Sequence, residues 1–191
     1  MARLARLFRR DASNGAVIRT ERLVLRSLED RDITVIARLA GDWDVASMTA
    51  RVPYPYTQDD ARQWLDHLEP GEVVYAIDRE GEMIGLTGFL PSEDGASAEI
   101  GYWIGKPFWG HGYATEAATA LIRRCFAQTN FTHLTCCHFT DNPASGRVVE
   151  KLGFALAGSC SCWCEARRRE APALHYVMHK PRGLRRGFKS T

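Results

Sequence analysis

The chain has 191 residues, of which 45% are hydrophobic and 25% charged, and its formal net charge is only +2. This composition is typical of one globular domain that buries roughly 70% of its unfolded surface. No apolar run reaches the ~18–20 residues that span a bilayer, and the arginine-containing start lacks an apolar segment long enough for secretion. These features argue against a membrane or secreted protein, so we expect a cytoplasmic one with no membrane partner.

The charge is unevenly distributed along the chain. Residues 1–10 carry four arginines and residues 180–191 carry five basic residues, and neither stretch contains an acid. Setting these nine aside leaves 16 basic against 23 acidic residues, so the remaining body has a net charge of −7. An acidic body suits a cationic, amine-bearing substrate, whereas basic ends either contact RNA or another polyanion or only keep the protein in solution. We expect a basic extension over 1–16, one domain over 17–180 and a basic tail over 181–191.

The first half of the chain predicts a strand followed by two helices. Alternation over 20–26 indicates the strand, and acidic residues at the start of 30–40 indicate a helix. The prolines of 52–56 favour extended backbone. Thr57 and Asp60 then have the spacing of a capping box, which predicts the start of the second helix.

The second half predicts mainly strands, with two helices between them. A turn at 79–82 joins the first two of these strands into a hairpin. Asn142 and Pro143 favour the start of a helix, and Gly153 favours its end. With no internal repeat and no linker, we predict one mixed α/β domain. The predicted strands are 73–78, 83–90, 98–104, 133–139, 159–164 and 174–178, and the helices run from about 114 to 128 and from 143 to 152.

Six cysteines raise the question of disulfides or a metal. For a chain of this length without a secretion signal we expect reduced thiols. Cys160, Cys162 and Cys164 alternate along a predicted strand and would share one face, but no C-x-x-C pair accompanies them. We therefore predict strand packing or surface thiols rather than structural zinc, and no metal site. The remaining cysteines are Cys125, Cys136 and Cys137.

The segment Trp109-Gly110-His111-Gly112-Tyr113-Ala114-Thr115-Glu116-Ala117 lies between a predicted strand and a predicted helix. Glycines let main-chain N–H groups approach a ligand closely, and a helix start adds unpaired donors and partial positive charge. This arrangement is suited to a phosphate or pyrophosphate. The alternative interpretation is a tight turn that binds nothing.

Four motifs in this order resemble the GNAT N-acetyltransferases, and within them the RimJ/RimL group, which acetylates the N-termini of ribosomal proteins. The resemblance covers about residues 19–180. It implies a mostly antiparallel, twisted mixed sheet flanked by helices. It also implies transfer of an acetyl group from acetyl-CoA to an amine, with coenzyme A as product and no metal. The motifs are Glu99–Ile104, the glycine loop, Asn142-Pro143-Ala144-Ser145 and Glu150–Phe154, and 20–26 and 52–55 fit the same group.

The resemblance also implies how acetyl-CoA is held. Main-chain N–H groups of the glycine loop would bind the pyrophosphate, and the end of the preceding strand would pair with the pantetheine arm and polarise the thioester carbonyl. Asn142 would bond a pantetheine amide besides capping its helix. The cofactor-binding residues predicted in this way are Trp103, Ile104, Gly110, His111, Gly112, Tyr113, Ala114, Thr115, Asn142 and Ser145. We expect the Trp103 side chain itself to belong to the core.

Two positions depart from the family pattern. Pro107 stands where a Gln or Arg usually lies three residues before the first glycine, so backbone N–H groups must do more of the phosphate binding. Val149 stands where many members, seven residues after the capping Asn, carry the Tyr that protonates the departing thiolate. Ser145 is the polar residue that the group's pattern offers instead. The alternative for Ser145 is a first-turn residue bonded only to the backbone.

The general base is open between two residues. Glu99 lies on the strand entering the site, where partial desolvation would raise its pKa and let it accept a proton directly or through water. A solvated strand residue is the alternative interpretation of Glu99. His138 on the next predicted strand is the other candidate, with a packed histidine as its alternative, and His111 is expected to face solvent. We predict Glu99 and Ser145 as the catalytic residues.

The sequence leaves the acceptor amine open. The resemblance favours the N-terminal α-amine of a ribosomal protein, and the acidic body is equally compatible with a small amine such as an aminoglycoside or polyamine. The basic ends and the missing family residues raise a third hypothesis, a non-catalytic CoA-binding module associated with the ribosome or RNA. The expected partners are thus an amine-bearing protein or small molecule, with ribosome or RNA contact through the basic ends, for a monomer or homodimer.

Overall fold

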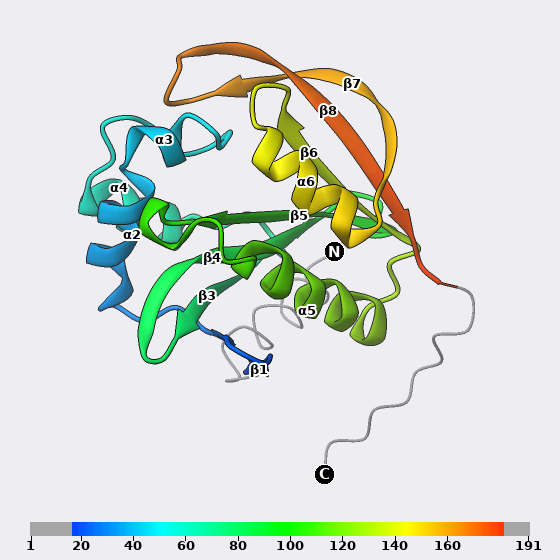
Figure 1. Ribbon diagram of the computed structural model, residues 1–191, viewed down its shortest axis with the longest axis horizontal. Helices are drawn as coiled ribbons and strands as arrows, with labels where there is room; N and C mark the ends of the chain where they lie inside the picture. The colour runs from blue at the N-terminus through cyan, green and yellow to red at the C-terminus, as the bar shows by residue number, and fades with distance from the viewer. Residues whose placement is uncertain (1–16, 182–191) are drawn as a thin grey trace.

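The computed structural model describes residues 17–181 (Figure 1). The predicted basic extension over 1–16 lies outside the described residues, as does the predicted tail except for its first residue. Their expected contacts with RNA therefore remain predictions. Within the described range, no helix is long and apolar enough to cross a membrane.

Strands and helices alternate as the predicted order requires. Each predicted helix and strand has a counterpart, which supports the mixed α/β prediction. In chain order the described elements are β1 (Ile18–Arg19), β2 (Val24–Arg26), α2 (Asp32–Ala40), α3 (Trp43–Ala46), α4 (Gln58–Asp66), β3 (Val73–Arg79), β4 (Glu82–Pro91), β5 (Ser97–Ile104), the 3-10 helix η1 (Lys106–Phe108), α5 (Tyr113–Gln128), β6 (His133–Phe139), α6 (Pro143–Leu152), β7 (Ala155–Cys164) and β8 (Arg169–His179).

The described strands form one eight-stranded sheet in the order β1-β2-β3-β4-β5-β6-β8-β7. Neighbouring strands are antiparallel throughout, except that β5 and β6 are parallel. The mostly antiparallel mixed sheet implied by the family resemblance is thereby confirmed. The long β7–β8 hairpin curves over one end of the sheet (Figure 1).

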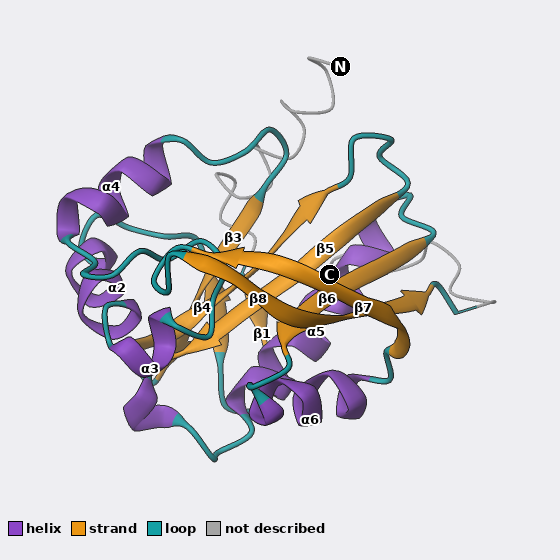
Figure 2. Ribbon diagram, turned by 90° about the horizontal axis from the view of Figure 1, so that it is seen from above, coloured by secondary structure: helices purple, strands orange, loops and turns teal. Residues whose placement is uncertain are grey.

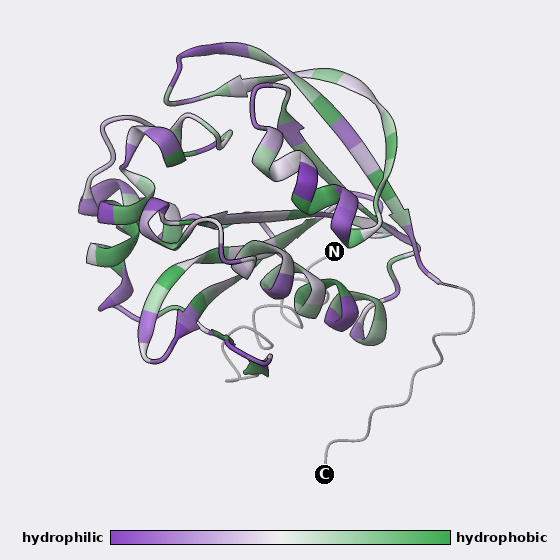
Figure 3. Cartoon of the chain, in the orientation of Figure 1, coloured by the Kyte–Doolittle hydropathy of each residue, from purple (hydrophilic) through white to green (hydrophobic). Residues whose placement is uncertain are grey.

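Helices cover the sheet on opposite faces (Figure 2). Helices α5 and α6 pack on one face, and α2 and α4 pack on the other. Alternate side chains of a strand point to opposite faces, so Tyr75 and Ile77 join the core beneath α5, whereas Ala76 joins the core beneath α2. Each turn of α5 carries both hydrophobic and hydrophilic residues (Figure 3), as expected for a helix with one buried face.

The predicted helix ends are confirmed by their hydrogen bonds. Thr57 and Asp60 make the reciprocal bonds of a capping box at the start of α4. The Asn142 side chain accepts a bond from the Ser145 N–H at the start of α6. Gly153 ends α6 with a φ of 87°, a conformation that glycine adopts without steric cost.

Several predicted boundaries are wrong, and each has a local cause. Of the strand predicted over 20–26, only Val24–Arg26 is a strand, and a second short strand, Ile18–Arg19, precedes the predicted range. The Thr20 hydroxyl and the Leu23 backbone bond each other and close a turn between the two strands. Segment 52–56 is an irregular loop with bends rather than a fully extended stretch. Strands β7 and β8 are longer than predicted, because β7 is exposed along nearly its whole length and shows no clear hydrophobic alternation. The short α3 and η1 were not predicted.

A buried ion network holds β2, α2 and β3 together. The Arg26 guanidinium donates to both Asp32 carboxylate oxygens at 2.7 and 2.9 Å and to Asp78 Oδ2 at 3.0 Å. Asp32 also accepts the Glu29 N–H at 2.8 Å, and Asp32 is only 2% exposed. Burial alone would raise the pKa of Asp32, but the bonds from Arg26 and Glu29 hold it below its ordinary value. Asp32 is therefore ionised in the folded protein at neutral pH.

Asp32→Asn should lower the free energy of unfolding by about 3 kcal/mol at neutral pH, because it leaves a buried guanidinium short of a charged partner. The folded-state pKa of Asp32 is depressed, so this contribution is present above about pH 4 and is lost as pH falls through the folded value. Urea unfolding of wild type and variant over a pH series measures both effects. The exposed Asp30→Asn is the matched control and should change stability by less than about 0.5 kcal/mol. Equal losses in the two variants would contradict the role of Asp32.

Candidate active site

A cleft of about 1420 Å³ opens where β5 and β6 part. The two strands pair only from Ser97 to Glu99 on β5, opposite residues 133–135 on β6, although β5 continues to Ile104 and β6 to Phe139. Both unpaired stretches line the cleft. The cleft volume exceeds the ~300–1,000 Å³ of most single-ligand pockets, so two substrates can be accommodated.

The two faces of β5 present different chemistry to this opening. Ile100 and Ile104 belong to the core beneath α5, and Tyr102 shares their parity. Glu99 and Trp103 have the opposite parity, and Trp103 packs against the core beneath α2. The opening between β5 and β6 therefore connects two sides of the sheet that are otherwise separate.

The predicted glycine loop lies at one end of the cleft and leads into α5. Gly110 and Gly112 have φ values of 82° and 80°, which favour glycine. Gly112 is the N-cap of α5 and has no side chain with which to cap it. The first intrahelical bond of α5 is made by Glu116, so the N–H groups at the helix start have no helical partner. The space around Gly110 is open, since a Cβ atom there would meet nothing within 4 Å.

A network that was not predicted fixes this loop to the first turn of α5. Glu116 accepts the Thr20 hydroxyl at 2.6 Å, the Arg22 N–H at 2.8 Å and Arg22 Nε at 2.8 Å. Arg22 Nη1 in turn donates to the His111 carbonyl oxygen at 3.0 Å. The turn between β1 and β2 thus braces the loop. Arg22 and Glu116 are 94 residues apart in sequence, so no local pattern could have identified the pair.

The same network sets the electrostatics beside the loop. Burial would raise the pKa of Glu116, but the bonds from Thr20 and Arg22 lower it overall, so Glu116 is ionised. The guanidinium carbons of Arg22 and Arg79 lie 4.8 and 5.6 Å from the centre of the Tyr113 ring. The exposed His111 ring stacks on Tyr113 with ring centres 5.4 Å apart. Two arginine side chains therefore lie beside the loop. Pro107, in η1 just before the loop, supplies no charged side chain.

Trp103 and Ile104 lie at the end of β5, paired with Leu86 and Gly85 of β4. The partly buried Trp103 side chain packs against the core beneath α2 and also lines the cleft, and Ile104 is only 6% exposed. The Trp109 indole N–H donates to the Ile104 carbonyl oxygen at 2.6 Å. The Ile104 carbonyl thus already accepts one hydrogen bond from a side chain of the glycine loop.

Ser145 has a partner that the sequence did not reveal. The Ser145 hydroxyl lies 2.9 Å from the Tyr102 hydroxyl, so a side chain of β5 and one of α6 meet in the cleft. Burial is the main cause that raises the pKa of Tyr102, to about 12. Tyr102 therefore keeps its proton at neutral pH. Strand alternation, with Tyr102 on the parity of Ile100 and Ile104, is the signal that could have identified it.

The other predicted residues of α6 and β6 occupy structural positions. Asn142 uses its side-chain oxygen to cap α6, at 3.0 Å from the Ser145 nitrogen. Val149 is 1% exposed in the core, so its position holds no polar group. His138 is buried and both of its ring nitrogens are engaged, with the Phe139 carbonyl oxygen at 2.8 Å and the Tyr176 hydroxyl at 3.2 Å. The packed interpretation of His138 is supported.

Glu99 lies at the last paired position of β5, opposite Thr135, and lines the cleft. Its side chain is exposed, which favours the alternative interpretation of a solvated strand residue. The cleft on this side also contains an ion pair between the exposed Arg51 and the buried Glu72, and the Glu69 N–H donates to Glu72 as well. Among the described residues, the charged groups lining the cleft are Asp44, Arg51, Asp60, Glu72, Glu99, Asp141, Arg147 and Lys151, with acids outnumbering bases.

The cysteines gather differently from the predicted arrangement. Cys160 and Cys162 meet Cys137 of β6, whereas the buried Cys164 thiol donates to the carbonyl oxygens of Ser47 and Thr49 at 3.6 and 3.3 Å. Cys160 and Cys162 lie close together on β7, as their alternation predicts. The third cysteine beside them is Cys137 of β6 and not Cys164.

Comparisons with known proteins agree with this geometry. A family model described as an acetyltransferase (GNAT) domain matches residues 22–155. The uncharacterised Bacillus subtilis protein YkkB is 31% identical over 154 residues, which cover 75% of this chain and 88% of that protein. The ribosomal-protein-serine acetyltransferase of Escherichia coli is 33% identical over 86 residues, covering 44% of this chain and 48% of that enzyme. The solved RimL ribosomal L7/L12 α-N-protein acetyltransferase in complex with coenzyme A superimposes with a TM-score of 0.73 at 20% identity, covering 85% of this chain and 97% of that one.

Glu116→Ala should loosen the glycine loop without unfolding the domain. Hydrogen bonds to a charged group contribute roughly 1.5–3 kcal/mol, so local opening should increase at least about tenfold. Hydrogen–deuterium exchange measures this opening at the amides of residues 20–23 and in the first bonded turn of α5. The exposed Glu150→Ala on α6 is the control and should leave those amides unchanged. Unaltered exchange in Glu116→Ala would show that the network does not brace the loop.

Proposed function

The chain belongs to the GNAT acetyltransferases and is an acyltransferase enzyme of the N-acetyltransferase type, and from this premise we propose that it transfers acetyl from acetyl-CoA to the N-terminal α-amine of a protein. The observation that carries the proposal is that β5 and β6 stop pairing at Glu99. The cleft that opens there is lined by the glycine loop and by acidic side chains. Acetyl-CoA and the amine can then approach one another from the two faces.

The glycine loop fits the pyrophosphate of acetyl-CoA. Its helix-start N–H groups lack helical partners, and the space at Gly110 is open. Arg22 and Arg79 lie nearby, each paired with a carboxylate, Glu116 and Glu80. Main-chain donors and helix ends bind phosphate groups in this way. We assign Gly110, His111, Gly112, Tyr113, Ala114 and Thr115 to this contact. We assign the free edge of β5 at Trp103 and Ile104, together with the Asn142 amide, to the pantetheine arm.

Bound acetyl-CoA supplies a thioester, and this chain's residues then handle two protons. Glu99, exposed on the acceptor face, removes the proton from the incoming ammonium, directly or through water. Tyr102 and Ser145, on the opposite face, donate toward the sulfur of the departing thiolate. The Tyr102 and Ser145 hydroxyls lie 2.9 Å apart, so together they offer the sulfur a donor in place of the hydroxyl that Val149 lacks.

Asp60 and Glu99 line the cleft and support an amine-bearing acceptor. The other lining acids, Asp44, Glu72 and Asp141, are already paired with Lys106, Arg51 and Arg167. Half-exposed aromatic side chains also line the cleft at Trp109 (46%) and Trp163 (49%). The relatives whose names include ribosomal proteins favour the same acceptor. A small amine is the second candidate, since acidic groups recognise any cation.

An acceptor screen tests the proposal. Purified protein with acetyl-CoA is offered peptides with free or blocked N-termini, polyamines and aminoglycosides, and acetylation is followed by intact mass and release of free CoA. Acetylation of peptides with free N-termini only supports the proposed acceptor, and acetylation of small amines only overturns it in favour of the second candidate. Calorimetric binding of acetyl-CoA with no product on any amine would indicate a non-catalytic module.

Tyr102→Phe and Ser145→Ala should each lower kcat, because general-acid assistance to the leaving thiolate is lost. The variant with the larger effect should lose up to about 10²–10⁴-fold in kcat. The double variant should be little worse than that stronger single variant, since the two hydroxyls act as one unit. Steady-state kinetics with the best acceptor measure this. Tyr176→Phe, which removes a nearby hydroxyl bonded to His138, is the control with kcat near wild type. Strictly multiplicative effects would argue against a shared role.

Glu99→Gln should reduce kcat/KM for the amine by about 10²–10⁴-fold while leaving measurable activity, because a general base contributes that much and binding is retained. The KM for acetyl-CoA should stay unchanged, since Glu99 lies on the acceptor face. Glu93→Gln, on the turn before β5, is the control. If His138→Gln abolished activity and Glu99→Gln did not, the assignment of the base would have to be reversed.

A further inference from the structure

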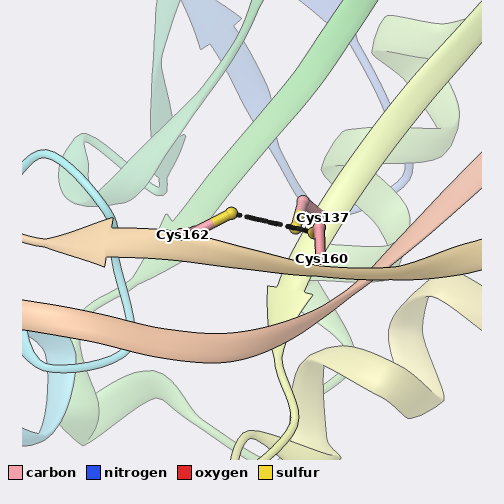
Figure 4. Close-up of side chains that lie close together, drawn as sticks. All are labelled: Cys137, Cys160 and Cys162. Atoms are coloured by element: carbon pink, nitrogen blue, oxygen red, sulfur yellow. Dashed lines mark hydrogen bonds between the residues drawn. The ribbon is translucent and has the colours of Figure 1, made fainter.

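The thiols of Cys137, Cys160 and Cys162 lie close together (Figure 4). The sulfur of Cys137 on β6 lies 3.6 Å from that of Cys160 and 3.7 Å from that of Cys162, both on β7, and the last two sulfurs are 3.9 Å apart. All three are free thiols. Among the described residues, their sulfur atoms lie close enough together to bind one metal ion.

These separations match the geometry of a thiolate-bound metal. A tetrahedral site with zinc–sulfur bonds of ~2.3 Å has sulfur–sulfur edges of about 3.8 Å. A covalent disulfide, by contrast, needs sulfurs at about 2.0 Å. Three sulfurs already placed at three corners of a tetrahedron can receive a zinc ion with small side-chain rotations.

The strands explain how sulfurs from β6 and β7 meet although β8 lies between them. On this face β8 presents Ala171 and Ala173, which pack in one cluster with Cys137 and Cys162. Alanine methyl groups are small enough for longer side chains from both neighbouring strands to converge above them. A bound ion would then tie the edge strand β7, which is exposed along most of its length, to the body of the sheet.

We propose that Cys137, Cys160 and Cys162 bind one zinc ion through three thiolates. The fourth position is left to water or another small ligand from the cleft, since Cys137 and Cys162 line it. Soft sulfur ligands select zinc over magnesium or calcium. The site is separate from the glycine loop and from Tyr102 and Ser145, so it does not depend on the proposed acetyl transfer.

Metal titration of the reduced, chelator-treated full chain tests the proposal. One equivalent of Co²⁺ should give a sulfur-to-cobalt charge-transfer band and the visible bands of tetrahedral coordination, and Zn²⁺ should displace it. Cys160→Ser and Cys162→Ser should each weaken Zn²⁺ binding at least roughly 100-fold. Losing a residue that only bonds a metal ligand already costs up to about 100-fold in affinity, and these substitutions remove a ligand itself. Cys164→Ser, on the same strand but bonded elsewhere, is the matched control and should bind as wild type does.

Thermal unfolding gives a second readout that does not need activity. With Zn²⁺ at 100 times its Kd, the Tm of wild type and of Cys164→Ser should rise by about 5–10 °C. The exposed Cys160→Ser, which should fold normally, should show no such rise. The proposal is overturned if the reduced wild type binds neither ion, if a Cys160→Ser/Cys162→Ser variant binds equally well, or if the thiols yield only a disulfide.

Discussion

The early end of parallel pairing between β5 and β6 is the constraint on which the rest of the site depends. Beyond Glu99 and Thr135 the facing edges of the two strands no longer bond one another, so their main-chain groups need other partners. Trp109 takes the Ile104 carbonyl, and a side-chain bridge from Tyr102 to Ser145 crosses the opening. The unpaired stretches of both strands line the cleft.

The strand period divides the chemistry between those faces. Glu99 and Tyr102 are three residues apart on β5, so their side chains point to opposite sides of the sheet. Glu99 is exposed and can exchange protons with water, whereas burial keeps Tyr102 protonated. The proposed base and the proposed proton donor therefore lie on opposite faces of one strand.

Contacts distant in sequence hold the loop in place. The Arg22, Glu116 and Thr20 network joins the first strands to the start of α5 and fixes the loop before any ligand arrives. Preorganised donors stabilise bound charge without a further ordering cost. The β7–β8 hairpin has fewer such ties along its exposed strand, and the three-cysteine group lies where an ion would supply one.

The sequence by itself determined most of the fold, because its signals are local. The Thr57–Asp60 capping box, the Asn142 cap, Gly153 and the glycines of the loop each express a backbone preference within a few residues. Only the tertiary structure decided the meeting of Tyr102 with Ser145, of Arg22 with Glu116 and of Cys137 with Cys160, and the exposure of Glu99. These contacts depend on which strands become neighbours and on how the sheet curves. Side-chain packing across the whole domain determines both, and no short segment encodes them.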